Sequence, residues 1–197
     1  MKIERLEVGS FENNCYIVSC PETGEAVIID PAAEAEKILR EIKGLKVRYI
    51  LITHGHMDHI GALAEIRRET GAPVGIHEAD SRALREKADF FVADGQILKF
   101  GNLEMKAIHT PGHTAGGVCF LIGKVLFSGD TIFPNGPGNT ALPGADYRQI
   151  LKSIHSKVFT LPDRTTIYPG HGLETTVGRE KSLEFYPFPE TVSGGER

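Results

Sequence analysis

Residues 53 to 61 of this chain carry four potential metal donors: His54, His56, Asp58 and His59. Imidazole nitrogens and carboxylate oxygens together suit zinc, iron or manganese. Four donors on one short turn could grip a metal ion, but ligands from elsewhere in the chain would have to complete its coordination shell. Three histidines and one aspartate in this order rarely arise by chance, so the stretch predicts a metal site.

The donor stretch lies between a predicted strand and a predicted helix. Residues 47–52 are apolar and partly β-branched, which is typical of a buried strand. Downstream, Ile60 and Leu63 begin a series of apolar residues at helical spacing. Since side chains alternate along an extended backbone, His54 and His56 are expected to project to the same side.

Three more donors, His113, Asp130 and His171, lie in loops next to other predicted strands. These strands are expected at residues 103–109, 118–122, 125–128 and 165–168. Polar loops at strand ends on a rigid sheet are where sites are usually built. If the strand ends share one edge, all seven donors converge.

The rest of the chain reads as alternating strands and helices in one domain, residues 1–197. Strands are expected at 2–9, 15–19, 26–30, 74–77 and 97–100, and helices at 33–43, at 78–87, after an N-cap at Asp146 and at 176–185. Residues 134–144 form a long loop, and residues 193–197 a frayed tail. Asn13 and Asn14 are expected to cap a turn.

The composition disfavours nucleic-acid and membrane partners and favours a cytoplasmic location. The net charge is −4, and no run of lysine or arginine is longer than two, which disfavours nucleic acid and a membrane surface as partners. The N-terminus lacks the pattern of a signal peptide. Cys15, Cys20 and Cys119 are an odd number without metal-finger spacing, and Cys15 and Cys119 read as buried free thiols. We expect a cytoplasmic protein; the oligomeric state stays open.

The motifs resemble those of the metallo-β-lactamase superfamily, and most closely those of its small glyoxalase II-like hydrolases. The resemblance spans roughly residues 8 to 185 and rests on the donor stretch and four further segments: Thr110-Pro111-Gly112-His113-Thr114, Ser128-Gly129-Asp130-Thr131, Leu142-Pro143-Gly144-Ala145-Asp146 and Tyr168-Pro169-Gly170-His171-Gly172. It implies an α/β fold, the four-layer αββα sandwich, with two sheets face to face, helices outside and the site at one edge.

The resemblance also implies two divalent metal ions, with zinc the first choice and iron or manganese as alternatives. It assigns His54, His56 and His113 to one ion, Asp58, His59 and His171 to the other, and Asp130 to a bridge between them. In such a site the two metals share a water and convert it to hydroxide, which attacks a small thioester or ester. Asp58 has a second expected role, as the catalytic group that orients this hydroxide and receives its proton.

Two other functions stay open at this stage. The fold also occurs in persulfide dioxygenases, which would use one iron held by His54 or His56, His113 and Asp130. A catalytically inactive metal-binding module is the other alternative, because a fold alone never fixes a function. Antibiotic hydrolysis is less favoured, since Asp130 stands where one major β-lactamase subclass has cysteine.

The sequence departs from the family pattern at one residue that could affect substrate choice. Many relatives carry Gly-Arg where this chain has Gly138-Asn139, so a cation that positions an anionic substrate is missing. Arg179 and Lys181 could partly compensate, but solvated charges on a helix are the favoured interpretation for both. The remaining histidines are expected to be structural or solvated: His77, His109 and His155.

Overall fold

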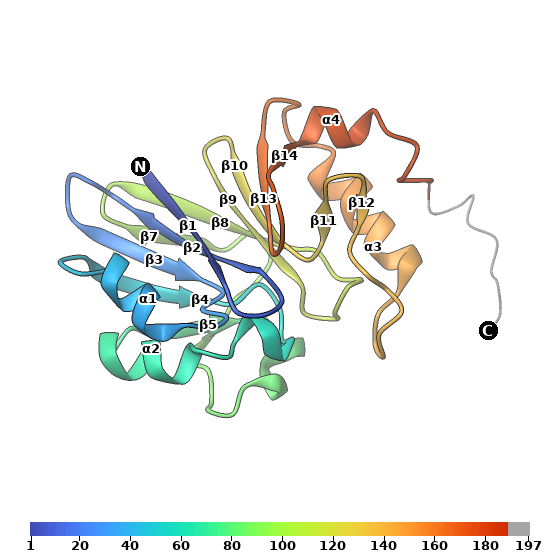
Figure 1. The fold of residues 1–197 in the computed structure, drawn as a ribbon. Coiled ribbons are helices and arrows are strands. Elements are labelled where there is room, and N and C mark those ends of the chain that lie inside the picture. Colours follow the sequence, from blue (N-terminus) through green and yellow to red (C-terminus); the bar gives the residue numbers. More distant parts are fainter. Residues whose placement is uncertain (189–197) are drawn as a thin grey trace.

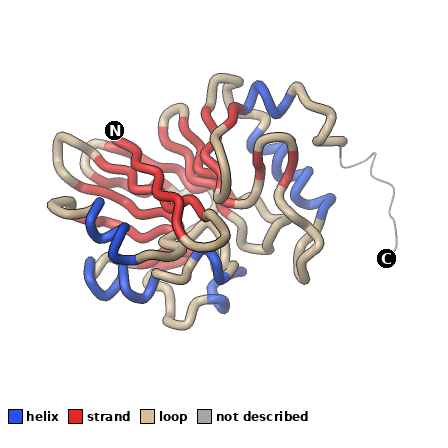
Figure 2. Tube along the Cα trace, viewed as in Figure 1, coloured by secondary structure: helices blue, strands red, loops and turns tan. Residues whose placement is uncertain are grey.

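The computed structural model describes residues 1–188, so the tail expected at 193–197 lies outside the described residues. Two six-stranded sheets pack face to face, and helices cover their outer faces (Figures 1 and 2). A two-stranded ribbon, β11 (Ile132–Phe133) with β12 (Gly136–Pro137), stands beside the second sheet. The αββα sandwich implied by the resemblance is thereby confirmed.

The first sheet has its strands in chain order: β1 (Lys2–Val8), β2 (Asn13–Ser19), β3 (Glu25–Ile29), β4 (Lys46–Leu51), β5 (Val74–Ile76) and β6 (Phe90–Phe91). The first three strands are antiparallel, and β3 to β6 are parallel. Helices α1 (Ala35–Glu41) and α2 (Leu63–Thr70) cover its outer face and bury Ile38 and Ile66 there. This face is apolar because alternate strand residues point to it, as period two requires.

The second sheet runs in the order β14-β13-β10-β9-β8-β7. Its strands are β7 (Ile97–Phe100), β8 (Leu103–His109), β9 (Val118–Ile122), β10 (Val125–Gly129), β13 (Thr166–Pro169) and β14 (Thr175–Thr176). Helix α3 (Tyr147–Ser153) and the π-helical turn η3 (Ile154–Val158) pack on its outer face, next to α4 (Val177–Lys181). The Asp146 side chain accepts a hydrogen bond from the Gln149 N–H, so its expected role as N-cap is confirmed.

The core between the sheets joins alternate residues from both. Val18 and Val27 of the first sheet belong to one buried cluster with Phe100, Phe120 and Phe127 of the second. Rigid apolar packing of this kind fixes the two sheets against each other. The loops at the sheet edges are therefore anchored to a well-packed core.

The strand directions explain why the seven donors meet. β10 pairs parallel with β13 and antiparallel with β9, which in turn is antiparallel to β8. β8, β10 and β13 therefore run the same way, and the loops after them leave the second sheet at one edge. The loop after β4 in the first sheet faces them there (Figure 1).

Local differences from the sequence-based expectation concern short elements. The helix expected at 78–87 is only a 3₁₀ turn, η2 (Glu78–Ala83), and the donor stretch contains a second one, η1 (Met57–His59). The two-residue strands β6, β11, β12 and β14 were not expected, because pairing with distant residues and not local pattern creates them. Within residues 1–188 no helix has the length and apolar character that a membrane crossing requires.

Candidate metal centre

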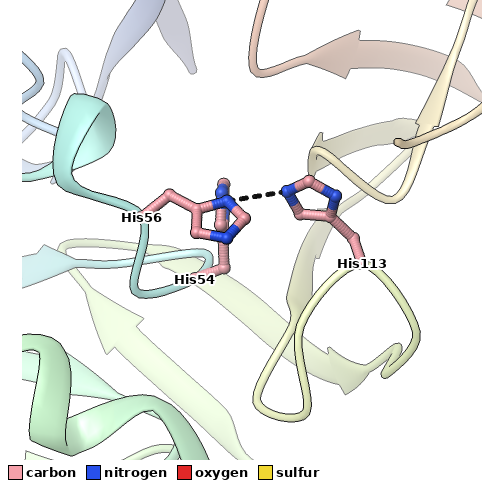
Figure 3. A group of neighbouring side chains, drawn as sticks. All are labelled: His54, His56 and His113. Carbon is pink, nitrogen blue, oxygen red and sulfur yellow. Dashed lines mark hydrogen bonds between the residues drawn. The ribbon is translucent and has the colours of Figure 1, made fainter. Parts of the chain in front are cut away.

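The first donor group consists of His54, His56 and His113, which meet from opposite sheets (Figure 3). One ligand atom from each lies within 4.8 Å of the others. His56 Nδ1 lies 2.9 Å from His113 Nε2, so the two rings point their nitrogens at each other. His54 and His113 are buried, whereas His56 is partly exposed.

The second donor group consists of Asp58, His59 and His171, whose ligand atoms also lie within 4.8 Å of one another. His171 Nε2 is 3.5 Å from Asp58 Oδ2, and His59 Nε2 is 3.7 Å from the same oxygen. His59 is fully buried, while Asp58 and His171 are partly exposed. The second group thus lies nearer to solvent than the first.

Asp130 stands between the two groups. Its Oδ1 lies 3.4 Å from His59 Nε2, and its Oδ2 lies 3.6 Å from His113 Nε2 and 3.7 Å from His171 Nε2. One carboxylate therefore faces nitrogens of both groups, an arrangement that suits a bridging ligand. The structure brings all seven sequence-predicted donors together.

Two of the histidines are oriented by backbone carbonyls. His113 Nδ1 lies 2.7 Å from the Asn139 carbonyl oxygen, and His171 Nδ1 lies 2.8 Å from that of Phe11. A carbonyl only accepts, so each Nδ1 carries the proton and each Nε2 keeps a lone pair directed at the centre. Metal-binding histidines in proteins are usually held in this way.

Asp30 and Thr53 orient the other two buried rings. Asp30 accepts hydrogen bonds from the Thr53 N–H and hydroxyl and from His59 Nδ1, at 2.7, 2.6 and 3.0 Å. The Thr53 hydroxyl donates its hydrogen to Asp30, so its oxygen accepts the hydrogen bond from His54 Nδ1, at 3.0 Å. Sequence reasoning treated Asp30 only as the end of a strand and missed this role, because its partners lie more than twenty residues away.

Three buried atoms at the centre lack a hydrogen-bond partner: His54 Nε2, His59 Nε2 and Asp130 Oδ1. Buried polar atoms are normally satisfied, and each one left alone costs about 1–3 kcal/mol. All three are atoms that could ligate a metal ion. The donor set and these unsatisfied atoms therefore fit divalent cations such as zinc or iron.

The histidines of the centre differ in the direction in which their pKa values are shifted. Burial holds the pKa of His54 well below its ordinary value and also lowers that of His56, so both rings are neutral and ready to bind a cation. Burial opposes protonation of His59 too, but the carboxylates of Asp130 and Asp30 outweigh it and raise its pKa to about 10. Burial would raise the pKa of Asp130, yet the His59 ring holds it below its usual range.

Asp80 ties the two loops of the first group together. Its carboxylate accepts hydrogen bonds from the Gly55 N–H at 2.9 Å, the Thr114 hydroxyl at 2.7 Å and the Gly116 N–H at 2.7 Å. Gly55 separates His54 from His56, and Thr114 follows His113 directly. A Cβ on Gly116 would come within 2.6 Å of the Asp80 carboxylate, so this close approach requires glycine.

Asn13 and Asn14 attach the start of β2 to the His171 loop. The Asn13 side chain donates to Asp58 Oδ2 at 3.0 Å and lies 3.3 Å from His171 Nε2, while Asn14 donates to the carbonyls of Pro169 and Gly172. The prediction that they cap a turn was wrong, since neither bonds within its own turn. Nothing in the local sequence signals a contact with residues some 150 positions away.

The other residues singled out from the sequence have structural contacts. Cys15, Cys20 and Cys119 are free and buried, and burial raises the pKa of Cys15 and Cys119, so neither is an activated nucleophile. The Ser128 hydroxyl donates to the Ile132 carbonyl. His77 stacks on His109, and His155 bonds to the Tyr186 carbonyl. Arg179 pairs with Glu180 and bonds to Asn135, and Lys181 lies 3.9 Å from Asp163.

Sequence comparison gives the same family over most of the chain. The family model described as the metallo-beta-lactamase superfamily matches residues 8–171. A Haemophilus influenzae protein named hydroxyacylglutathione hydrolase GloC is 36% identical over 203 aligned positions, which cover 92% of this chain and 95% of that protein. A Bacillus subtilis protein named probable metallo-hydrolase YqgX is 34% identical, with the same two coverages.

Solved structures of this fold include three that are close in shape. BLEG-1, described as a B3 metallo-beta-lactamase, has a TM-score of 0.87 at 33% identity and covers 92% of this chain and 97% of its own. ETHE1 from Myxococcus xanthus has a TM-score of 0.86 at 29% identity, with coverages of 95% and 84%. TTHA1623, described in a di-iron-bound form, has a TM-score of 0.78 at 33% identity, with coverages of 91% and 97%.

Proposed function

The chain belongs to the metallo-beta-lactamase superfamily, and on that premise we propose that it is a dinuclear, glyoxalase II-like hydrolase of a small thioester or ester. The single observation that carries the proposal is the double set of donors: two triads whose ligand atoms converge, with Asp130 between them. The relative named hydroxyacylglutathione hydrolase supports the thioester class, and the di-iron form of TTHA1623 supports two metals.

His54, His56 and His113 would hold one ion, Asp58, His59 and His171 the other, and Asp130 would bridge them. When bound, two divalent cations polarise the scissile carbonyl and lower the pKa of a water molecule between them. We favour zinc, which suits nitrogen and oxygen donors, with iron or manganese as alternatives. The free cysteines agree with a cytoplasmic location.

Asp58 is the residue we assign to proton transfer. Its Oδ2 accepts the hydrogen bond from Asn13 at 3.0 Å, which fixes the plane of the carboxylate. The carboxylate is partly exposed, so it can meet a water that enters from solvent, orient it and take its proton. A group in this position commonly contributes about 10²–10⁴ in rate.

The direct test combines metal analysis with hydrolysis of S-lactoylglutathione by the full chain. We expect two metal ions per chain after full loading, and turnover that a chelator abolishes and added metal restores. Fewer than two ions in a fully loaded preparation would contradict the dinuclear assignment. Two ions without hydrolysis of any thioester or ester tested would contradict the activity.

The Asp58→Asn variant separates the proton-transfer role from folding. We expect an unchanged melting temperature of the metal-free protein and about a hundredfold loss of kcat, because asparagine keeps the shape but cannot take a proton. Thermal unfolding and steady-state kinetics on the same preparation measure both. Unchanged turnover would refute the role given to Asp58.

A second candidate is an iron-dependent persulfide dioxygenase, which one feature favours. His54 and His113 with Asp130 form a set of two histidines and one carboxylate, the ligand type of many non-haem iron(II) oxygenases. Oxygen uptake with glutathione persulfide by the iron-loaded protein distinguishes the two functions. We rank this candidate second, because it leaves Asp58, His59 and His171 without a task.

A further inference from the structure

A cavity of about 280 Å³ opens beside His56, outside the ring of donors. Its wall includes the η2 turn and Thr114, and small side chains such as Ala79, Ala83 and Ala115 leave the space open. Pro143 and Gly144 also line it. The volume lies near the lower limit for small-molecule sites, about 300–1,000 Å³.

Arg82 is the basic residue in the wall of this cavity. It is exposed, and its guanidinium makes no hydrogen bond or ion pair with any residue from 1 to 188. A guanidinium offers five donors in a planar fork that matches a carboxylate. The cavity therefore combines a cation with unused donors and a candidate metal ligand, His56.

Asp80 is the acidic residue of the same wall, but its carboxylate is already occupied. Both of its oxygens accept hydrogen bonds, from Gly55, Thr114 and Gly116, at distances of 2.7–2.9 Å. Donors that surround a carboxylate compensate much of its charge. Asp80 thus holds the cavity wall in shape and leaves Arg82 to interact with a ligand.

Other arginines that could serve an anionic substrate are engaged elsewhere. Arg179 is bound to Glu180 and Asn135, and Arg5 donates to the Gly172 carbonyl and lies 4.0 Å from Glu174. Asn139 supplies its backbone carbonyl to His113 and carries no charge of its own. Among the described residues that line this cavity, Arg82 is the cation that can meet an anionic arm of a substrate.

We propose that the cavity beside His56 is a substrate subsite, in which Arg82 binds a carboxylate on one arm of the thioester or ester. This inference rests on the proposed function, because it places the scissile bond at the adjoining donor centre. Arg82 acts on a part of the substrate remote from the reacting carbonyl. It therefore strengthens binding of the ground state and transition state alike, and its loss should raise KM with kcat unchanged.

The test measures binding separately from turnover. The zinc-loaded full chain is titrated calorimetrically with S-hexylglutathione, a thioether that is neither a thioester nor an ester, and with its bis(ethylamide), in which both carboxylates are masked as amides. We expect wild type to prefer the free acid, and Arg82→Ala to weaken binding of the acid about tenfold while leaving binding of the amide unchanged. Arg82→Lys should retain part of the preference, because it keeps the charge but loses the planar fork.

Arg85→Ala is the matched control. Arg85 is an exposed arginine three residues further on, and it lines a different pocket, with Leu63 and Leu84, that contains none of the candidate donors. It should bind both probes as wild type does. Equal binding of acid and amide by wild type, or an equal loss of both in Arg82→Ala, would overturn the subsite. Failure of hydrolysis with the acid preference intact would overturn only the proposed function.

Discussion

The two donor groups differ in how far along the chain their supports lie. The first group uses residues 54–113, and its supports, Asp30 through Thr53, Asp80 and the Asn139 carbonyl, all lie between residues 30 and 139. The second group ends at His171 and depends on Asn13 and the Phe11 carbonyl, so it needs the two ends of the folded domain together. One centre therefore contains a locally braced half and a half that depends on global closure.

Exposure follows the same division. His54 and His113 are 1% and 5% exposed, whereas the side chains of Asp58 and His171 are 28% and 26% exposed. An ion in the first group would be shielded, and one in the second would be open to substrate and to exchange. The comparison teaches that the halves should differ in metal retention even though their donors are chemically similar.

The largest effect should come from Asp130, which belongs to both halves. Asp130→Asn keeps the shape but removes the charge that faces His59, His113 and His171. We expect loss of tight binding at both positions and about a thousandfold loss of kcat/KM, or about 4 kcal/mol. Metal analysis and kinetics check this. Retention of both ions in Asp130→Asn would contradict the assignment of Asp130 as a ligand shared by the two positions.

Single ligand deletions should separate the halves. His171→Ala is expected to reduce the metal content from two ions to one per chain, while the ion of the first group stays bound. His113→Ala should release the more shielded ion and also weaken the second group through Asp130, so less than one ion per chain should remain. Elemental analysis after dialysis against a weak chelator measures both variants. Identical metal contents in the two variants would abolish the distinction.

A smaller effect is expected for the brace of the first group. Asp80→Asn loses part of the clasp on Gly55, Thr114 and Gly116, and should weaken binding of the first-group ion about 10–100-fold. Competition with a chromogenic chelator measures the affinity. Asp89→Asn is the control, because Asp89 also accepts a backbone N–H, from Val74, but does so away from the centre. An equal loss in the control would assign the effect to general stability.

The last prediction concerns the pH dependence of the metal-free protein, in which no effect on a bound ion is involved. Against the effect of burial, Asp130 and Asp30 raise the pKa of His59 from 6.5 to about 10. The charged ring therefore stabilises the fold fully below about pH 6.5, and this contribution is lost as pH rises towards 10. Denaturant unfolding between pH 6 and 10 should show the decline, and His59→Gln should flatten it.

His54→Gln provides the contrast for that experiment. Burial lowers the pKa of His54 well below its ordinary value of 6.5, so above about pH 7.5 its ring is neutral in folded and unfolded chains alike. The variant should keep the wild-type slope between about pH 7.5 and 10. A flattened slope in His54→Gln as well would show that the decline in stability with pH does not come from His59 alone.

The sequence allowed prediction of the donors because their spacing and their places after strands are local features. His54 and His56 follow β4 directly, and Asp130 and His171 follow β10 and β13, so strand recognition was enough to suggest one shared edge. The sandwich itself came from the resemblance and is confirmed by two stacked sheets. Whether the seven donors hold metal stays a proposal.

The supports of the donors could not be predicted, because each depends on a tertiary contact. Asp30 read as a strand end, Asp80 as part of an exposed helix, and Asn13 as a turn cap. Their true partners lie 23 or more positions away for Asp30, 25 to 36 for Asp80 and 45 or more for Asn13. Local periodicity carries no information on such long-range pairings. The donors could be recognised without it, because their own sequence motifs identify them.

The bridge between Asn13 and His171 has a consequence for biosynthesis. The donors of the first group are all synthesised once residue 113 has been added to the nascent chain, whereas the second group still lacks His171 at that point. During synthesis the first group could therefore assemble before the second.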